Sequence, residues 1–378
     1  MFRSLALALL VFLGLARSEQ NPDRILDRAI QLHQSGNIQG AIREYRAYLK
    51  LRPNAFEARS NLGAALAHDG LYNEAIVEYR LALGEQPDNP GVLLNLALAY
   101  YKSGRFSEAA HQLAQVRTRQ PENRQALLIE ADCHLRLGEN KQVIDLLSPL
   151  EKGNQTDLAV TYLLGTALIR DKQPERGQVL IDRILRNGDS AEARLLMGTT
   201  KSMVGDYAGA LAELKRAVEL NPKLPDVYSY YGMALLHTGD TSGAADAFRK
   251  ELASNPNDFT ANLELGALER QDQDYDPAVA HLKHALDLRP GDPGARYQIA
   301  AANFSLGKVD EARVELEKLI AESPQFTEAH VTLATVYYRL KRKADGDRER
   351  AIVKKLEAER QAKQPGAAAQ RSETAAPK

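Results

Sequence analysis

The stretch Asn61–Pro87, NLGAALAHDGLYNEAIVEYRLALGEQP, decides the fold of this chain. It contains small residues at Gly63 and Ala75, with Gly70 between them and a proline at the end. Two helices pack closely where both present small side chains, and Gly70 accepts the left-handed conformation that ends a helix. Pro87 cannot continue the second helix and restricts the residue before it. The stretch therefore predicts a hairpin of two helices.

The same features recur at a constant interval along the chain. The terminal proline recurs every 34 residues in two series, Pro53, Pro87 and Pro121, then Pro222, Pro256, Pro290 and Pro324. Self-similarity at a fixed period of about 34 residues is the signature of a solenoid. One hairpin cannot bury its apolar face alone, so the stacking of neighbours supplies the core.

Each repeat is numbered here so that the proline is position 32. Position 8 is small in every repeat, position 20 is Ala or Gly except at Val143, position 24 is large and apolar, and position 15 is glycine in seven repeats. We expect positions 8 and 20 to form the close contact within each hairpin, above all at Gly63, Ala75, Gly198, Ala210, Gly232, Ala244, Gly266 and Ala278.

This pattern resembles the tetratricopeptide repeat (TPR), with small residues at 8 and 20, an aromatic or apolar residue at 24 and proline at 32. The resemblance covers residues 22–345. It implies an all-α, right-handed α-solenoid of about nine TPR helix-turn-helix repeats plus a C-terminal capping helix. Position 4 lacks the tryptophan of the family, which predicts looser packing there.

Composition excludes several classes of function. The chain has 378 residues, 49 Lys+Arg against 50 Asp+Glu, and a net charge of -1, which argues against a nucleic-acid binder. One cysteine excludes an internal disulfide framework and a zinc site built from several thiolates. We expect Cys133 to be a buried apolar residue, with an intermolecular disulfide as the alternative.

The N-terminal segment has the features of an export signal. Met1-Phe2-Arg3 precedes the apolar run Leu5–Ala16, which is shorter than the ~20 residues of a membrane-spanning helix. We expect residues 1–18 to be a signal peptide and the mature chain, without a membrane span, to lie in the periplasm or outside the cell. The alternative is a buried first helix.

The array divides into regular and irregular segments. We expect TPR repeats 1–4 over 22–155, an irregular fifth repeat over 156–190, repeats 6–9 over 191–324, a partial repeat and capping helix over 325–362, and a disordered tail over 363–378. Pro149 lies inside a second helix, which predicts a kink or an early helix end at Leu147–Leu150. This irregular segment is either a less stable junction between two regular arms or sequence drift that the repeat tolerates.

No motif of catalysis is present. The chain lacks His-Glu-x-x-His, a phosphate-binding glycine loop and a Gly-x-Ser-x-Gly elbow. His281 and His284 lie three residues apart on a predicted helix, but two ligands without a third are a weak metal signal. We therefore expect no cofactor and no metal, and an independent hydrolase or metal enzyme is disfavoured.

The first helices of the repeats offer a candidate binding surface, because in TPR proteins these helices line a concave groove. Position 6 is Asn61 and Asn95 in adjacent repeats, and asparagine can both donate to and accept from an extended peptide backbone. The pair resembles two rungs of the asparagine ladder in the TPR arm of O-linked N-acetylglucosamine transferases. Further candidates on this face are the aromatic residues Tyr101, Tyr162 and Tyr230.

Position 13 carries a row of cations in four successive repeats, His68, Lys102, Arg136 and Arg170. Such a row could hold an acidic or C-terminal carboxylate ligand, and it partly resembles the carboxylate clamp of chaperone-binding TPR domains. The alternative is that these cations only complement the dipole at the ends of their helices.

Together these features predict a non-catalytic scaffold that binds an extended peptide or protein segment in the groove, in the assembly of an envelope or secreted complex. The alternative is an accessory or substrate-recruiting TPR subunit of a separate enzyme, such as a glycosyltransferase or a secretion machine.

Overall fold

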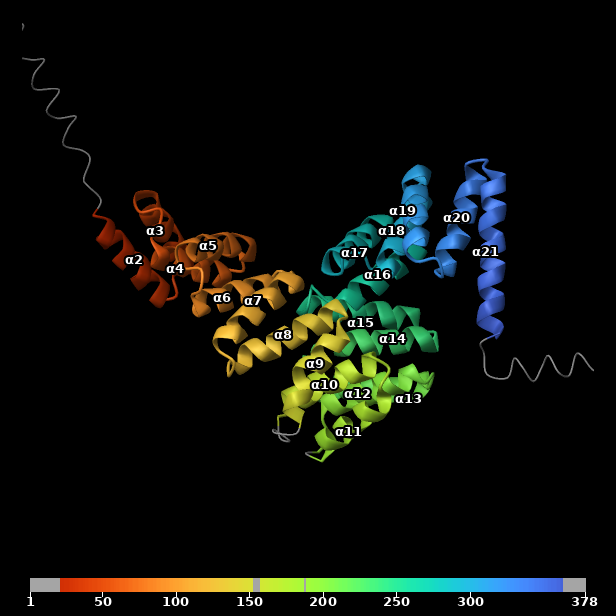
Figure 1. Cartoon of the computed structure of the whole chain (residues 1–378), viewed down its shortest axis with the longest axis horizontal. Helices are drawn as coiled ribbons and strands as arrows, with labels where there is room; N and C mark the ends of the chain where they lie inside the picture. The colour runs from red at the N-terminus through yellow and green to blue at the C-terminus, as the bar shows by residue number, and fades with distance from the viewer. Residues whose placement is uncertain (1–20, 152–156, 187, 363–378) are drawn as a thin grey trace, which may run out of the picture. The chain divides into compact units, whose positions relative to one another are not determined.

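The computed structural model describes residues 21–151, 157–186 and 188–362, and this part of the chain contains twenty α-helices and no β-strand. The chain divides into two compact units, Met1–Asp171 and Lys172–Lys378. Each unit is a succession of helix hairpins (Figure 1). The expected signal peptide and disordered tail lie outside the described residues.

The described residues of the first unit form nine helices, of which α2 to α9 make four successive pairs. The bounds are α2 Pro22–Gln34, α3 Ile38–Leu51, α4 Phe56–His68, α5 Tyr72–Glu85, α6 Pro90–Lys102, α7 Phe106–Arg119, α8 Arg124–Leu137, α9 Asn140–Glu151 and α10 Leu158–Arg170. Each helix packs on the next, and the first helices of neighbouring pairs also touch, as α4 does α6 and α8 does α10.

The second unit continues the same alternation. Its helices are α11 Pro174–Leu185, α12 Ala191–Met203, α13 Tyr207–Leu220, α14 Val227–Thr238, α15 Thr241–Ser254, α16 Phe259–Gln271, α17 Tyr275–Leu288, α18 Pro293–Ser305, α19 Val309–Glu322, α20 Thr327–Arg339 and α21 Lys343–Ala362. The last pair has the spacing of the others, but α21 is lengthened to 20 residues. The all-α solenoid predicted from the period of the sequence is confirmed.

The helix ends follow from the residues that occupy them. Asn21, Asn89 and Asp292 each accept a hydrogen bond from a backbone N–H in the first turn of the helix that follows, at 2.9–3.1 Å. Each second helix that precedes a position-32 proline ends two residues before it, as α5 does at Glu85. All seven glycines at position 15 have the predicted positive φ, between 78° and 91°.

The core of each hairpin is the contact between its two helices. A Cβ built on Gly63 would lie 2.7 Å from Cε1 of Tyr79, and one on Gly232 would lie 2.7 Å from Cε1 of Phe248. A Cβ built on Gly198 would lie 2.5 Å from Leu214, and one built on Gly266 would lie 2.8 Å from Leu282. Position 24 therefore packs directly over position 8, while Ala75, Ala210, Ala244 and Ala278 are fully buried beside it.

The expected helix end at Leu147–Leu150 is wrong, whereas the alternative of a kink there stays a prediction. Helix α9 continues through Pro149 to Glu151, so it does not end at Leu147–Leu150. Pro149 lies in the last turn, where its missing N–H removes a single hydrogen bond and the apolar contacts of buried Val143 and Leu147 keep the helix in place. None of the helices in residues 21–151, 157–186 and 188–362 is both long enough and apolar enough to cross a membrane.

Candidate functional site

The two asparagines at position 6 lie on neighbouring first helices of the first unit. Asn61 is on α4 and Asn95 is on α6, and these two helices are in contact. Both side chains are half-buried, and neither amide makes a hydrogen bond to any residue that the structure describes. A partly buried amide without a partner retains its full capacity to donate and accept, so these two positions can bind a polypeptide backbone.

The row at position 13 differs along its length. His68 and Lys102 are exposed, whereas Arg136 and Arg170 are half-buried. Arg136 donates from Nε to Oδ2 of Asp132 at 2.7 Å and to the hydroxyl of Tyr101 at 3.2 Å. Arg170 donates from Nη1 to the carbonyl of Leu135, in the last turn of α8, at 3.2 Å. Half of the row therefore links neighbouring repeats.

Tyr101 belongs to the same junction between repeats. Its hydroxyl donates to Oδ2 of Asp132 at 2.5 Å, and the guanidinium of Arg136 lies 5.5 Å from its ring centroid. Burial, followed by the Asp132 carboxylate, raises the pKa of the Tyr101 hydroxyl. Tyr162 on α10 and Tyr230 on α14 are both half-buried. Tyr230 lies in the second unit, so it belongs to a different segment of the predicted surface.

The remaining candidates for chemistry have structural surroundings. Nδ1 of His281 lies 2.8 Å from Oε2 of Glu269, whereas Nε2 of His284 lies 3.0 Å from Oδ1 of Asn257, so the two imidazoles contact different segments. Cys133 is buried, as predicted, and burial raises the pKa of its thiol. A buried protonated thiol is unreactive, which leaves it a small core residue.

A recurrent polar contact escaped the sequence analysis. Position 4 pairs with the same later position of its hairpin, always a glutamate, at Arg59–Glu78, Arg194–Glu213, Arg296–Glu315 and His330–Glu349, at 2.5–2.7 Å. In two of these repeats the position-4 side chain also donates to the carbonyl of the preceding position-32 proline, from Arg59 to Pro53 and from His330 to Pro324. The departure from the family's tryptophan is therefore a polar link between the two helices of a hairpin, and the constant spacing of the two partners was its signal.

Three carboxylates lie together in the second unit. Oxygen atoms of Asp226, Glu251 and Asp258 are all within 4.8 Å of one another, and Glu251 and Asp258 are buried. Glu251 accepts hydrogen bonds from the backbone N–H groups of Asp226 and Tyr228 at 3.0 and 3.2 Å, and so caps α14 from α15. Burial and the two neighbouring aspartates raise the pKa of Glu251 to about 7. Glu251 therefore accepts hydrogen bonds from two backbone amides while it lies next to two other carboxyl groups.

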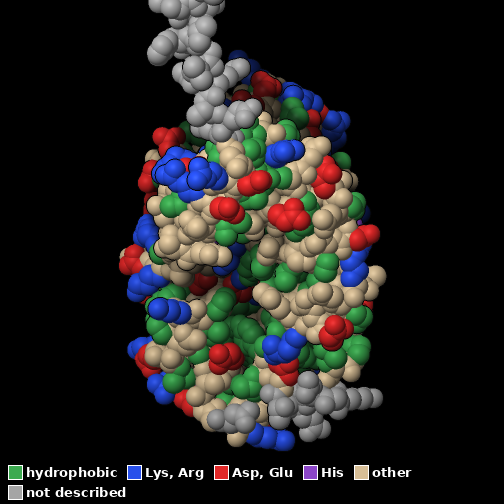
Figure 2. Space-filling model, turned by 90° about the vertical axis from the view of Figure 1, so that its left-hand side faces the viewer, with side chains coloured by type: hydrophobic (Ala, Val, Ile, Leu, Met, Phe, Trp, Pro, Cys, Tyr) green, Lys and Arg blue, Asp and Glu red, His purple; other side chains and the backbone are tan. Residues whose placement is uncertain are grey.

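On the face that Figure 2 presents, acidic and basic side chains are interspersed, with hydrophobic side chains showing between them. This interspersed pattern on the face shown agrees with the nearly balanced net charge of -1.

Two curated proteins are similar to part of this chain. The chain is 25% identical over 147 residues to BBSome complex member BBS4 of Bos taurus, a match covering 39% of this chain and 28% of that protein. It is 26% identical over 174 residues to anaphase-promoting complex subunit 3 of Schizosaccharomyces pombe, covering 45% and 26%. The chain thus spans little more than a quarter of the length of these curated relatives.

The chain also matches solved structures at low sequence identity. A tetratricopeptide repeat protein from Parabacteroides merdae is 16% identical with a TM-score of 0.38, covering 75% of this chain and 99% of that one. MamA is 20% identical with a TM-score of 0.37, covering 43% and 96%.

Family models decide the assignment. One model of the tetratricopeptide repeat matches residues 66–129 and 269–322, and a second matches residues 26–90, 195–259 and 242–293. Their matches fall in both compact units and include the packing positions Gly63, Ala75, Gly198, Ala210, Gly232, Ala244, Gly266 and Ala278. The chain belongs to the tetratricopeptide repeat family.

Proposed function

We propose that this protein is a non-catalytic scaffold that binds an extended segment of a partner protein along the first helices of its repeats. One observation carries the proposal: Asn61 and Asn95 repeat on touching helices, half-buried and without hydrogen bonds to the described residues. Backbone amides of an extended chain supply the donors and acceptors that such a pair requires.

The relatives give this proposal its general form. Two of them are named as members of multiprotein complexes, which agrees with a scaffold that assembles other chains. The tyrosines of the first helices add apolar contact area with few rotatable bonds, a property of residues that contribute strongly to interfaces.

Site-specific cross-linking tests the proposal. A photo-reactive amino acid at position 95, on a first helix, should capture a partner from the native source. The same group at Val77, an exposed residue on the second helix α5, should not capture that partner. The double variant Asn61→Ala, Asn95→Ala should weaken binding of the captured partner while the helical content stays unchanged. Equal capture from positions 77 and 95, or undiminished binding by the double variant, would refute the proposal.

The asparagines are substituted in this test, and not the cations of the position-13 row, because one of those cations also packs the repeats together. Arg136 joins Asp132 and Tyr101 across a repeat junction, so its substitution would alter packing as well as any contact with a ligand. The asparagines make no such bond among the described residues, and their truncation separates binding from stability.

The cellular setting belongs to the same proposal. The apolar run Leu5–Ala16 supports export, and with it a role in assembling an envelope or secreted complex. Amino-terminal sequencing of the chain purified from its native source, together with cell fractionation, tests this point. A cytosolic chain that retains its first eighteen residues would refute it.

A further inference from the structure

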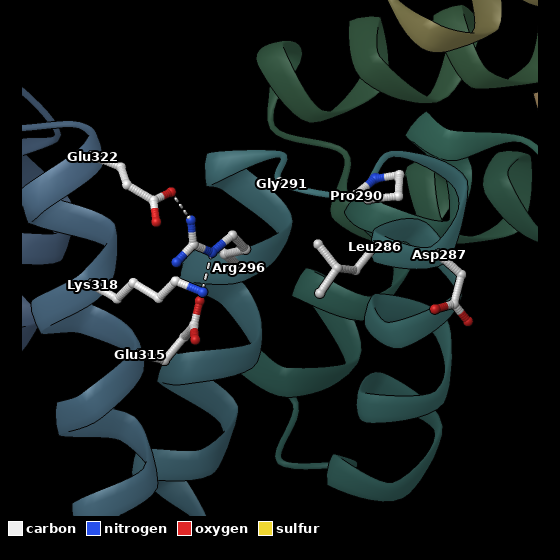
Figure 3. Close-up of a pocket in the computed structure, with 8 residues that line it drawn as sticks. All are labelled: Leu286, Asp287, Pro290, Gly291, Arg296, Glu315, Lys318 and Glu322. Atoms are coloured by element: carbon white, nitrogen blue, oxygen red, sulfur yellow. Dashed lines mark hydrogen bonds and ion pairs between the residues drawn. The ribbon is translucent and has the colours of Figure 1, made fainter. Parts of the chain in front are cut away.

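A cavity of about 500 Å³ lies in the second unit, whereas the asparagine pair belongs to the first. Its walls come from the end of α17 and the turn after it, from α18 and from α19 (Figure 3), and they consist of Leu286, Asp287, Pro290, Gly291, Arg296, Glu315, Lys318 and Glu322. A cavity of this size accommodates one or two amino-acid residues of a ligand. Two of its three walls are the second helices α17 and α19, and the third is the first helix α18, which carries Arg296.

The cavity lies where position 4 keeps its contact with the glutamate but does not bond the preceding proline carbonyl. At position 4 of other repeats, Arg59, Asn262 and His330 donate to the carbonyl of the proline six residues earlier. Arg296 instead donates from Nε to Glu315 and from Nη1 to Glu322, both at 2.5 Å. The carbonyl of Pro290 accepts no hydrogen bond from the described residues, and Pro290 stands apart from Arg296 across the cavity.

One polar group at this site is buried and unsatisfied. Arg296 is only 7% exposed, and its Nη2 has no hydrogen-bond partner in the described part of the chain. A buried donor without an acceptor costs about 1–3 kcal/mol in folded proteins, so it favours a ligand that brings an acceptor. Lys318, which borders the same wall, is exposed and can move aside at little cost.

The charges select the kind of acceptor. Asp287, Glu315 and Glu322 outnumber Arg296 and Lys318, and the positive charge of Arg296 is already matched by two glutamates. A second anion would be repelled here, whereas a neutral carbonyl would not. Asp287 is exposed, makes no ion pair among the described residues, and its carboxylate points away from Arg296 in Figure 3. The cavity thus has a donor at one end and an acceptor of cations at the other.

We infer that this cavity binds a basic residue, arginine or lysine, of a partner polypeptide. The backbone carbonyl of that residue accepts from Nη2 of Arg296, its aliphatic stem lies on Leu286, and its cation pairs with Asp287. Arginine fits better than lysine, because the unpaired carbonyl of Pro290 can take a second N–H of a guanidinium. The inference rests on the proposed scaffold function and adds the chemistry of one anchor residue.

Peptide binding to the full chain tests the inference. The probes are blocked, fluorescein-labelled nonapeptides of Gly, Ser and Ala with a central Arg, Lys, Gln or Glu, measured by fluorescence anisotropy. The Arg peptide should bind at least about threefold more tightly than the Gln peptide, the scale of one partly exposed ion pair. Preference for the Glu peptide, equal binding of the four peptides, or binding of none of them would overturn the inference.

Two variants locate the binding. Asp287→Asn should abolish the preference for Arg over Gln, whereas Glu219→Gln, at the same repeat position two repeats earlier and also exposed, should leave it intact. Arg296→Lys keeps a cation opposite Glu315 but removes Nη2, so it should weaken the Arg and Gln peptides by a similar factor. An unchanged preference in Asp287→Asn would overturn the inference. A partner that still cross-links at position 95 in that case would leave the scaffold proposal standing.

Discussion

At the scale of single residues, the ends of the first helices show how far a local conformation depends on residue type. Glycine occupies the left-handed position 15 in seven repeats, but Lys172, Gln273 and Lys341 adopt φ of 61–65° at the same position in the others. A side chain in this conformation costs roughly 1–2 kcal/mol relative to a right-handed one. The fold therefore imposes the conformation even where the residue disfavours it.

Replacing these residues with glycine should stabilise the protein. Gln273→Gly and Lys341→Gly are expected to raise the free energy of unfolding by about 0.5–1 kcal/mol each, since both side chains are exposed and only the backbone conformation changes. The matched control is Gly70→Gln, where a Cβ has open space around it and φ is 80°, and which should destabilise by about 1–2 kcal/mol. Urea unfolding measures all three, and a loss of stability in both glycine variants would contradict the prediction.

The carboxylate group around Glu251 should make stability depend on pH. Its pKa in the folded state, about 7, is above the value near 4.5 expected in the unfolded chain. Protonated Glu251 therefore favours the folded state fully below about pH 4.5, and this contribution is lost as the pH rises through 7. The loss from this group amounts to about 3 kcal/mol.

Unfolding measured between pH 5 and pH 8 in the wild type and in Glu251→Gln tests this prediction. The variant carries a neutral side chain at every pH, so its stability should change less over this interval than that of the wild type. Asp226 and Asp258 face Glu251 in both proteins, and they keep the comparison matched. Parallel pH profiles would show that Glu251 is already ionised below the interval.

At the scale of the helix hairpin, the contact between positions 8 and 24 carries the packing. Gly63 leaves no space for a Cβ, because the ring of Tyr79 would be 2.7 Å away. Gly84, in the last turn of α5, has no atom within 4 Å of its built Cβ. Close packing therefore requires glycine at Gly63, whereas no neighbour restricts the residue type at Gly84.

Substitution by alanine should have opposite effects on stability at these two glycines. Gly63→Ala is expected to lower the free energy of unfolding by about 1–3 kcal/mol, since the ring of Tyr79 has to move. Gly84→Ala should instead raise it by up to about 1 kcal/mol, because alanine favours the helix and meets no neighbour. Thermal unfolding followed by circular dichroism distinguishes the two. Similar effects of both substitutions would mean that position 8 is not a packing contact.

At the scale of the whole molecule, the chain divides into two compact units between Asp171 and Lys172. This boundary falls within residues 156–190, where the terminal proline is missing and one residue is lost from the period. Because repeats stabilise one another only through neighbours, we expect the interrupted pattern to weaken the cooperativity between the two arms.

Hydrogen exchange should show the weaker junction. Amides of α9, α10 and α11 are expected to exchange faster than those of α5 and α15, which belong to regular hairpins, because local opening costs less where the repeat pattern is interrupted. Mass-spectrometric exchange of the full chain measures this difference. Equal protection through all five helices would favour harmless sequence drift over a softer joint.

The sequence by itself determined the repeat, because period, small residues and prolines act locally or between neighbouring helices and recur often enough to be read without coordinates. Its glycines, N-caps and hairpin contacts follow from side-chain size and backbone preference at single positions. It also singled out Asn61 and Asn95, although only the structure shows that their amides make no bond to the described residues.

Only the tertiary structure decided which polar groups meet. The bonds of Arg136 to Tyr101 and Asp132, the pairing of Arg296 with Glu315 and Glu322, and the grouping of Glu251 with two aspartates depend on distances between side chains of different helices. A long polar side chain can reach several partners from one position, and burial selects among them. The cavity at Arg296 arises in this way, since the arginine turns to Glu322 and leaves the proline carbonyl that its counterparts bind.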